Sequence, residues 1–158
     1  MKRLLSILLL LASTQLYSQR LDIGVMRSYS VSKVQFSHLS GNYVVYGDSG
    51  KVCEIRASQS IQLKRNGEKI QVIQGGRSLG SHSVVELKEV NRSSSLKLKC
   101  LSPGTHKERK YKNDFRIFPE GNSSLTVVNL VEMDNYLAGV IESEGGGGKD
   151  LEYYKVQA

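Results

Sequence analysis

The stretch "QLKRNGEKIQV" at residues 62–72 sets the fold class of this 158-residue chain. Apolar and polar residues alternate on both sides of Asn66-Gly67. A period of two places successive side chains on opposite faces of a β-strand. Asn and Gly tolerate the positive φ that both turn positions of a type I′ hairpin require. We therefore predict a β-hairpin here, with Asn66-Gly67 as its turn.

The same alternation continues from Leu21 to about Val128 in short segments. The motifs "GDSGK" at 47–51 and "QGGRS" at 74–78 are turn signals. Short strands with close spacing favour antiparallel pairing. The predicted strands are KVQFS (33–37), NYVVYG (42–47), KVCEIR (51–56), SIQLKR (60–65), EKIQVI (68–73), SVVELKEV (83–90) and SLKLKC (95–100).

The period changes at Glu132, where apolar residues begin to recur at spacings of three and four. This spacing predicts a helix with one buried face. Asn129 is the candidate N-cap, and Glu132 three residues later completes a capping box. The stretch "KDLEYYKVQA" at 149–158 resumes the helical pattern after four glycines. The apolar positions of the first helix are Met133, Tyr136, Leu137, Val140 and Ile141.

These patterns together predict an α+β fold, in which a β-rich antiparallel body is followed by two helical segments. We expect one incomplete domain, because the pattern of the last helix has no terminating signal before Ala158.

The first 19 residues have the features of a secretory signal peptide. Lys2 and Arg3 precede an apolar run from Leu4 to Ala12, and small residues precede Gln19. The apolar run is shorter than the roughly 20 residues that span a bilayer. We therefore expect export to the periplasm or cell envelope, with membrane contact only during export.

The chain is basic, with 22 Lys and Arg residues against 15 Asp and Glu residues. It stays basic after removal of the signal peptide. In an exported protein this charge favours anionic envelope polymers over nucleic acid as partners. The densest basic run, "HKERKYK" at 106–112, fits either a solvated loop or an anion-binding patch.

Cys53 and Cys100 are the only cysteines. Export permits a disulfide between them, and two buried thiols are the alternative. The three histidines lie far apart without ligand spacing, so we predict no metal site. The sequence carries no cofactor signature.

Glu142 and Glu144 form an acidic pair of the kind that glycosidases use. Residues i and i+2 of a helix point about 200° apart, so the two carboxylates do not face one substrate. Glu144 falls on the apolar stripe, seven residues after Leu137, whereas Glu142 falls on the opposite side. Partial desolvation would raise the pKa of Glu144 and suit it to donate a proton. If the helix ends by Ser143, both carboxylates are solvated instead.

The stretch "LTVVNLVEMDNYLAGVIESE" at 125–144, followed by "LEYYKVQA" at 151–158, resembles the core of the stage II sporulation protein D and amidase-enhancer family (SpoIID/LytB). Val128-Asn129 matches the end of a strand, and Tyr136-Leu137-x-Gly139-Val140 matches the helix motif. Glu144 stands at the position of the catalytic Glu in the family. The matches in the following helix motif are Glu152, Lys155, Gln157 and Ala158.

Two upstream segments extend the resemblance. "YKNDFRI" at 111–117 is similar to the family's lead-in, with Asn113 in place of Gly. Asn is the other residue type that tolerates the left-handed conformation. "LDIGVM" at 21–26 resembles the opening strand. The resemblance thus implies a division into a signal peptide (1–19), a β-rich N-terminal part (20–110) and the truncated start of a catalytic core (111–158).

The resemblance implies a peptidoglycan lytic transglycosylase in which Glu144 is the single acid and base. The reaction would yield 1,6-anhydro ends on glycan strands. Candidate substrate-binding residues are Tyr136, Gly145, Gly146 and Lys155. The implied partners are peptidoglycan strands and a cell-wall amidase. A non-catalytic module that binds glycan or activates an amidase is the alternative.

The sequence departs from the family pattern directly after Glu144. Four glycines at 145–148 stand where the family commonly has Met-Pro. Consecutive glycines allow a polymer to approach the backbone closely, or they form a flexible hinge. Both interpretations place the glycines beside the candidate catalytic residue.

Overall fold

The computed structural model describes residues 20–27, 30–102, 104 and 108–144. The predicted signal peptide at 1–19 and the predicted second helical segment at 149–158 lie outside the described residues. The antiparallel β-rich body and the helix that follows it are confirmed. Within the described ranges, no helix is long and apolar enough to cross a membrane.

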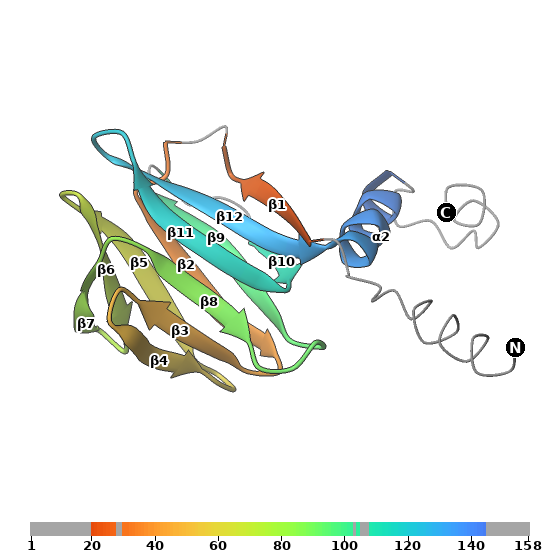
Figure 1. Cartoon of the computed structure of the whole chain (residues 1–158), viewed down its shortest axis with the longest axis horizontal. Coiled ribbons are helices and arrows are strands. Elements are labelled where there is room, and N and C mark those ends of the chain that lie inside the picture. Colours follow the sequence, from red (N-terminus) through yellow and green to blue (C-terminus); the bar gives the residue numbers. More distant parts are fainter. Residues whose placement is uncertain (1–19, 28–29, 103, 105–107, 145–158) are drawn as a thin grey trace, which may run out of the picture.

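Two antiparallel sheets of six strands face each other (Figure 1). Sheet A has the order β1-β12-β11-β8-β3-β4, and sheet B has the order β10-β9-β2-β5-β6-β7. The strands of sheet A are β1 (Arg20–Val25), β3 (Tyr43–Gly47), β4 (Gly50–Ile55), β8 (Val85–Glu89), β11 (Asp114–Glu120) and β12 (Ser124–Glu132). The strands of sheet B are β2 (Lys33–Ser40), β5 (Ser60–Asn66), β6 (Lys69–Gln74), β7 (Arg77–His82), β9 (Ser95–Ser102) and β10 (Arg109–Lys112).

The predicted hairpin is confirmed as β5 and β6, but its turn lies one residue further along. Asn66 pairs with Lys69, so the two loop residues are Gly67 and Glu68. Gly67 has a φ of 62°, whereas Asn66 and Glu68 do not have positive φ. The predicted type I′ turn is therefore wrong, since a glycine with positive φ at the first loop position alone is the type II′ pattern.

The hydrophobic core lies between the two sheets and is built from the predicted alternation. Phe36 of sheet B contacts Phe115 of sheet A edge to face, with the ring centroids 5.0 Å apart. Burying each large apolar side chain contributes roughly 1.5–3 kcal/mol to folding. The largest fully buried side chains are Tyr43, Phe36, Phe115, Ile55, Ile61, Leu63, Ile70, Leu87, Leu96, Leu98, Ile117 and Val31.

The basic run contains the strand β10, which alternation did not predict. The prediction of a loop is wrong for residues 109–112, which pair with β9 at the edge of sheet B, although most of these side chains are solvated as expected. Tyr111 anchors this strand, since its ring lies edge-on to Phe115 at 5.8 Å. The other three side chains of β10 are exposed. Charged side chains on an edge strand discourage pairing with other chains.

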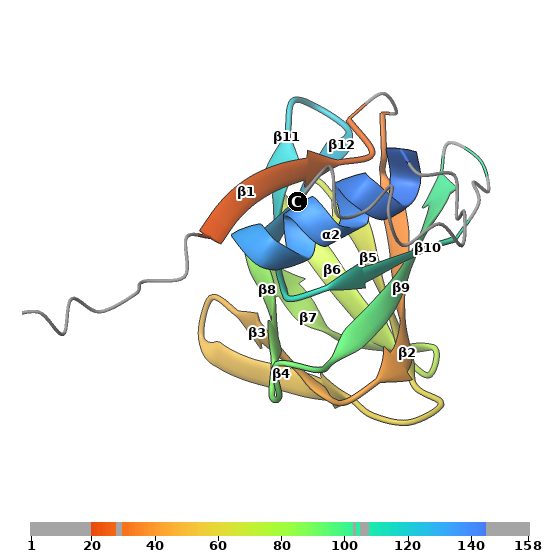
Figure 2. The ribbon, with the colours of Figure 1, turned by 90° about the vertical axis from the view of Figure 1, so that its right-hand side faces the viewer.

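Helix α2 (Met133–Glu144) follows β12 directly and lies across one end of the two sheets, between β1 and β10 (Figure 2). The predicted N-cap is wrong, because Asn129 is a buried residue of β12. Its Nδ2 donates hydrogen bonds to the carbonyl oxygens of Lys112 and Asp114, both at 2.9 Å. Asn129 therefore joins β12 to the preceding strands.

The predicted buried face of α2 is only partly buried. Val140 and Ile141 are half-buried, but Tyr136 is 37% exposed and Leu137 is 48% exposed. The physical reason is that α2 packs mainly against the end of β12.

Both cysteines are free thiols, which excludes the disulfide interpretation for this structure. Cys53 lies in β4 of sheet A, and the buried Cys100 lies in β9 of sheet B. Burial raises the pKa of the Cys53 thiol, which keeps it protonated near neutral pH.

Candidate functional site

Helix α2 forms one wall of a cavity of about 540 Å³. The facing walls come from the edge strands β1 and β10, with contributions from β2, β9 and β12. Figure 2 shows the elements around it, with α2 lying across the end of the two sheets between β1 and β10. The apolar lining residues are Ile23, Val25, Leu39, Val131, Ala138 and Val140.

The polar lining suits a ligand that carries hydroxyl or anionic groups. Asn129 and Asn135 supply side-chain amides, and Tyr136 supplies an aromatic ring with a hydroxyl. Lys110 and Lys112 of β10 are the charged residues of the described lining. None of the described lining residues is a carboxylate. The described part of the cavity therefore offers apolar, amide and aromatic surfaces to a ligand, but no acidic side chain.

Asn113 attaches the start of α2 to the sheets. Its Oδ1 accepts hydrogen bonds from the backbone N–H of Glu132 at 3.3 Å and from Nδ2 of Asn135 at 2.9 Å. Its own Nδ2 donates to Oε1 of Glu89 at 3.2 Å. The φ of 64° confirms the predicted left-handed conformation of Asn113. Asn113, rather than Asn129, thus satisfies the polar groups where the strand changes into the helix.

Three carboxylates lie behind this connection. Asp114 accepts a hydrogen bond from the backbone N–H of Glu89 at 2.9 Å and forms an ion pair with Arg20 at 3.1 Å. Burial, followed by the nearby charges of Asp114 and Glu132, raises the pKa of Glu89. The Oε2 atom of Glu89 is buried without a hydrogen-bond partner. An ionised Glu89 is therefore destabilising at this position.

This polar group was not found by sequence patterns, because its members lie on three strands that are distant in the sequence. The one available signal was local. Asn113 stands where the SpoIID/LytB motif that the sequence resembles has Gly, and this indicated an unusual backbone conformation. It gave no indication that the Asn113 side chain contacts α2.

The structure brings one predicted substrate-binding residue to the cavity and places the catalytic candidate on the same helix. Tyr136 lines the cavity. The backbone of Glu144 occupies the last position of α2, four residues after the lining residue Val140. The helix includes Ser143, so the interpretation in which it ends earlier is wrong. Gly145, Gly146 and Lys155 lie outside the described residues.

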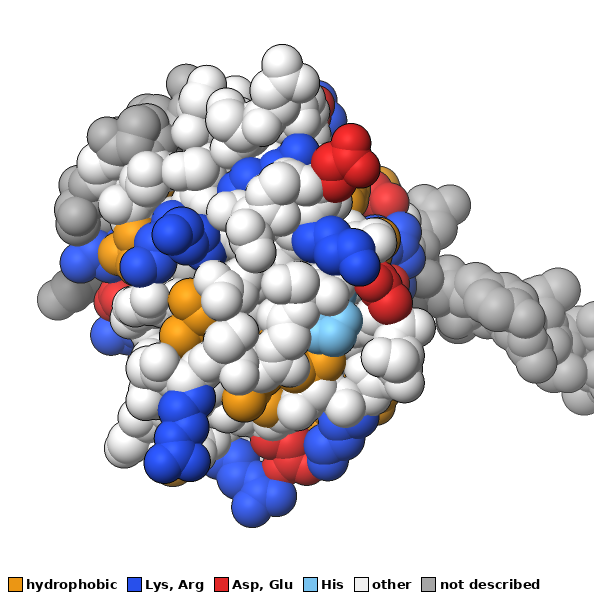
Figure 3. Space-filling model, turned by 90° about the vertical axis from the view of Figure 1, so that its left-hand side faces the viewer, with side chains coloured by type: hydrophobic (Ala, Val, Ile, Leu, Met, Phe, Trp, Pro, Cys, Tyr) orange, Lys and Arg blue, Asp and Glu red, His pale blue; other side chains and the backbone are white. Residues whose placement is uncertain are grey.

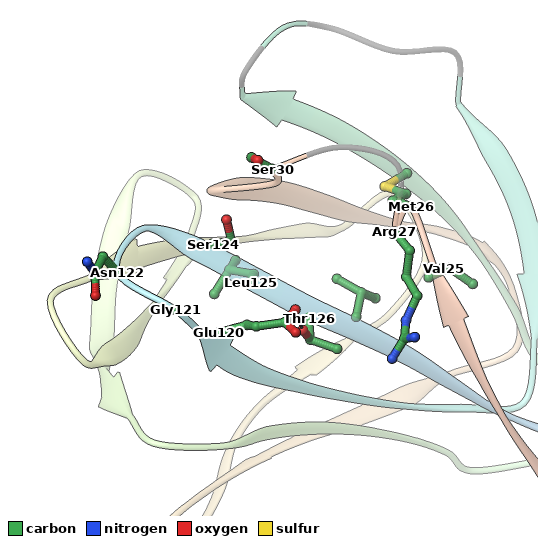
Figure 4. Close-up of a pocket in the computed structure, with 11 residues that line it drawn as sticks. Val25, Met26, Arg27, Ser30, Glu120, Gly121, Asn122, Ser124, Leu125 and Thr126 are labelled. Atoms are coloured by element: carbon green, nitrogen blue, oxygen red, sulfur yellow. Dashed lines mark hydrogen bonds between the residues drawn. The ribbon is translucent and has the colours of Figure 1, made fainter.

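A second cavity, of about 430 Å³, lies between the end of β1 and the turn that joins β11 to β12 (Figure 4). Arg27 and Glu120 are its charged lining residues, and Glu120 accepts a hydrogen bond from Oγ1 of Thr126. None of the predicted site residues lines it. The cavity beneath α2 is therefore the candidate functional site.

The described residues contain no group of three or more His, Cys, Asp or Glu side chains that could hold a metal ion. Comparison with protein-family models, with curated proteins and with solved structures finds no match to this chain.

Proposed function

We propose that this chain is an exported cell-wall protein that cleaves peptidoglycan glycan strands as a lytic transglycosylase. The proposal rests on the SpoIID/LytB-like motifs in the sequence. The observation that carries it is the continuity of α2, which lines the cavity through Val140 and reaches Glu144 one turn later. The proposed site needs only this one carboxylate.

The size and lining of the cavity support a sugar as the ligand. Its volume of about 540 Å³ lies within the usual range of small-molecule sites, roughly 300–1,000 Å³. The rings of Tyr111 and Tyr136 offer apolar surfaces with polar ends. Asn135 uses one of its two Nδ2 hydrogens on Asn113, so it can still donate one hydrogen bond to a sugar hydroxyl and accept others through Oδ1. Both hydrogens of Asn129 Nδ2 are already donated to backbone carbonyls, so Asn129 can offer only its Oδ1 as an acceptor.

The proposed reaction uses Glu144 twice. The protonated carboxyl donates its proton to the glycosidic oxygen as the bond from that oxygen to the muramyl C1 breaks. The resulting carboxylate then removes the proton from the muramyl C6 hydroxyl, whose oxygen bonds to C1. The product is a 1,6-anhydro end, and the proton returns to Glu144. No water is consumed.

A glutamine substitution tests this role directly. The full chain and its Glu144→Gln variant are incubated with glycan strands that lack stem peptides, and the products are analysed by mass spectrometry. General acid–base catalysis contributes about 10²–10⁴-fold, so we expect the rate of anhydro-end formation to fall by that factor. Glu142→Gln is the matched control, because it removes the neighbouring carboxylate on the same helix. Equal rates for wild type and Glu144→Gln contradict the mechanism.

A non-catalytic module that binds glycan or activates an amidase is the second candidate. It is favoured by two observations: the described lining of the cavity contains no carboxylate, and Leu137 of α2 is 48% exposed. Exposed apolar side chains on a helix suit contact with a partner protein. In this case wild type and Glu144→Gln bind glycan strands equally and yield no anhydro ends. A purified cell-wall amidase is then faster when either protein is added.

A further inference from the structure

The outer face of sheet B carries a track of lysines across four strands. The inward positions of these strands hold the core residues, for example Phe36 and Leu63, so the residues next to them point outward. The outward positions of the four strands contain no Asp or Glu. The lysines of the track are Lys33 (β2), Lys64 (β5), Lys97 and Lys99 (β9), and Lys110 and Lys112 (β10).

Two pairs of these lysines lie directly opposite each other in the sheet. Lys33 is in register with Lys64, and Lys97 is in register with Lys110. Directly opposed residues have Cβ atoms about 4.5–5.5 Å apart, and like charges at that distance are destabilising. Among the described residues only Glu108 offsets this charge, through an ion pair with Lys97 at 3.1 Å. A bound anion would remove a repulsion that the free protein contains.

Protection of a sheet edge does not explain the track. Only β10 is an edge strand, whereas β9, β2 and β5 are interior strands of sheet B. On sheet A, basic side chains are paired with acidic ones: Glu86 forms ion pairs with both Lys88 and Arg116. At the end of the molecule opposite α2, basic side chains are scattered among acidic and apolar ones (Figure 3). The unbalanced positive charge is therefore a property of the outer face of sheet B.

Neutral polar side chains fill the space between the lysines. Gln62 donates a hydrogen bond to Gln35 at 3.2 Å, and Gln35 donates to Ser37 at 3.1 Å. This row fixes the amides in place across β5 and β2. Amides and hydroxyls bind sugar hydroxyls. The outward positions of these four strands carry no aromatic ring, which binding of single-stranded nucleic acid by base stacking requires.

We propose that the outer face of sheet B binds a linear acidic polysaccharide, with the lysine track pairing successive carboxylates. From strand spacing and rise, the track from Lys64 to Lys110 is about 20 Å long, enough for several sugars. Lys110 and Lys112 also line the cavity beneath α2, so a bound chain leads toward that cavity. The inference does not depend on Glu144 or on catalysis.

The test measures binding of the full chain to oligogalacturonate, in which each sugar carries one carboxylate, by titration calorimetry at several salt concentrations. We expect Lys33→Gln/Lys64→Gln to weaken binding about tenfold. The slope of log affinity against log salt concentration should fall by about two, one for each lysine removed. Lys97→Gln/Lys110→Gln should do the same. The control is Lys51→Gln/Lys88→Gln, which removes equal charge from sheet A and should leave the affinity within about twofold of wild type.

Three results would overturn the proposal: equal weakening by the sheet A control, equal binding of neutral dextran, or tighter binding of DNA with the same number of charges. Thermal unfolding provides the folding control. Because the opposed lysines repel each other, Lys33→Gln/Lys64→Gln should unfold at or above the wild-type temperature, and oligogalacturonate should raise the midpoint of wild type more than that of the variant.

Discussion

Replacement of Asn113 tests the connection between the sheets and α2. Asn113 is fully buried and has a left-handed backbone, with a φ of 64°. Its side chain makes three hydrogen bonds, to Glu89, to the backbone of Glu132 and to Asn135. Asn113→Ala removes all three hydrogen bonds and keeps a Cβ in the left-handed conformation, as in the wild type. Asn113→Gly removes the same hydrogen bonds but also relieves the steric cost of that Cβ.

The expected magnitudes follow from these contacts. Each hydrogen bond contributes about 1 kcal/mol net, so Asn113→Ala, which keeps a Cβ as in the wild type, should lower the free energy of unfolding by about 2–3 kcal/mol. A left-handed conformation costs a residue with a Cβ roughly 1–2 kcal/mol, and Asn113→Gly relieves this cost. Asn113→Gly should therefore lower the free energy of unfolding by only about 1–2 kcal/mol. Asn66→Ala is the control, because Asn66 is exposed and its change should stay within about 0.5 kcal/mol.

Urea unfolding measures the totals, and hydrogen exchange locates the effect. Two of the three hydrogen bonds go to Glu132 and Asn135, so amides of α2 should lose protection before those of β5. The reasoning is refuted if Asn113→Gly is as stable as wild type, or if Asn113→Ala and Asn113→Gly are equally destabilised.

Three further outcomes are expected. Gly47→Ala should lower the free energy of unfolding by roughly 1–3 kcal/mol, because its Cβ would lie 2.3 Å from Nδ1 of His82. Gly139→Ala should instead stabilise α2 by up to about 1 kcal/mol, because a Cβ there meets nothing within 4 Å. Calorimetry that finds a change of the same sign for both variants contradicts this expectation. Glu89→Gln should stabilise the protein at pH values above the raised pKa of Glu89, because it removes a buried charge. The gain in stability should vanish as the pH falls toward the ordinary carboxyl pKa. If urea unfolding gives the same gain at every pH, burial of the charge is not the cause. Tyr136→Ala should weaken glycan binding about tenfold, because the ring lines the cavity. It should not lower the stability, because the side chain is 37% exposed. Unchanged binding in calorimetry would show that the sugar binds elsewhere.

The sheets could be predicted from the sequence because alternation is a local signal. The hairpin around Gly67 and the core position of Phe36 both follow from a period of two. Strand β7 gave no such signal, since five of its six residues are exposed and it is held by pairing with β6. Strand β10 was hidden by its charges, because only Tyr111 contacts the core.

The candidate site was predictable only in part. Helical spacing located α2 and placed Tyr136 and Glu144 on it. The cap was assigned wrongly to Asn129, because a capping box is a sequence pattern and β12 continues through that residue. The function of Asn113 depends on contacts with Glu89 and Asn135, which become neighbours only when the strands pair. Sequence spacing does not determine which distant polar side chains meet.

The most direct test of the proposed chemistry is the fate of water oxygen in the product. Glycan strands without stem peptides are digested with the full chain in water enriched in heavy oxygen, and the new ends are analysed by mass spectrometry. Attack by the muramyl C6 hydroxyl predicts 1,6-anhydro ends that contain no heavy oxygen and that are lost with Glu144→Gln. Reducing ends that contain heavy oxygen would show hydrolysis and contradict the proposed mechanism.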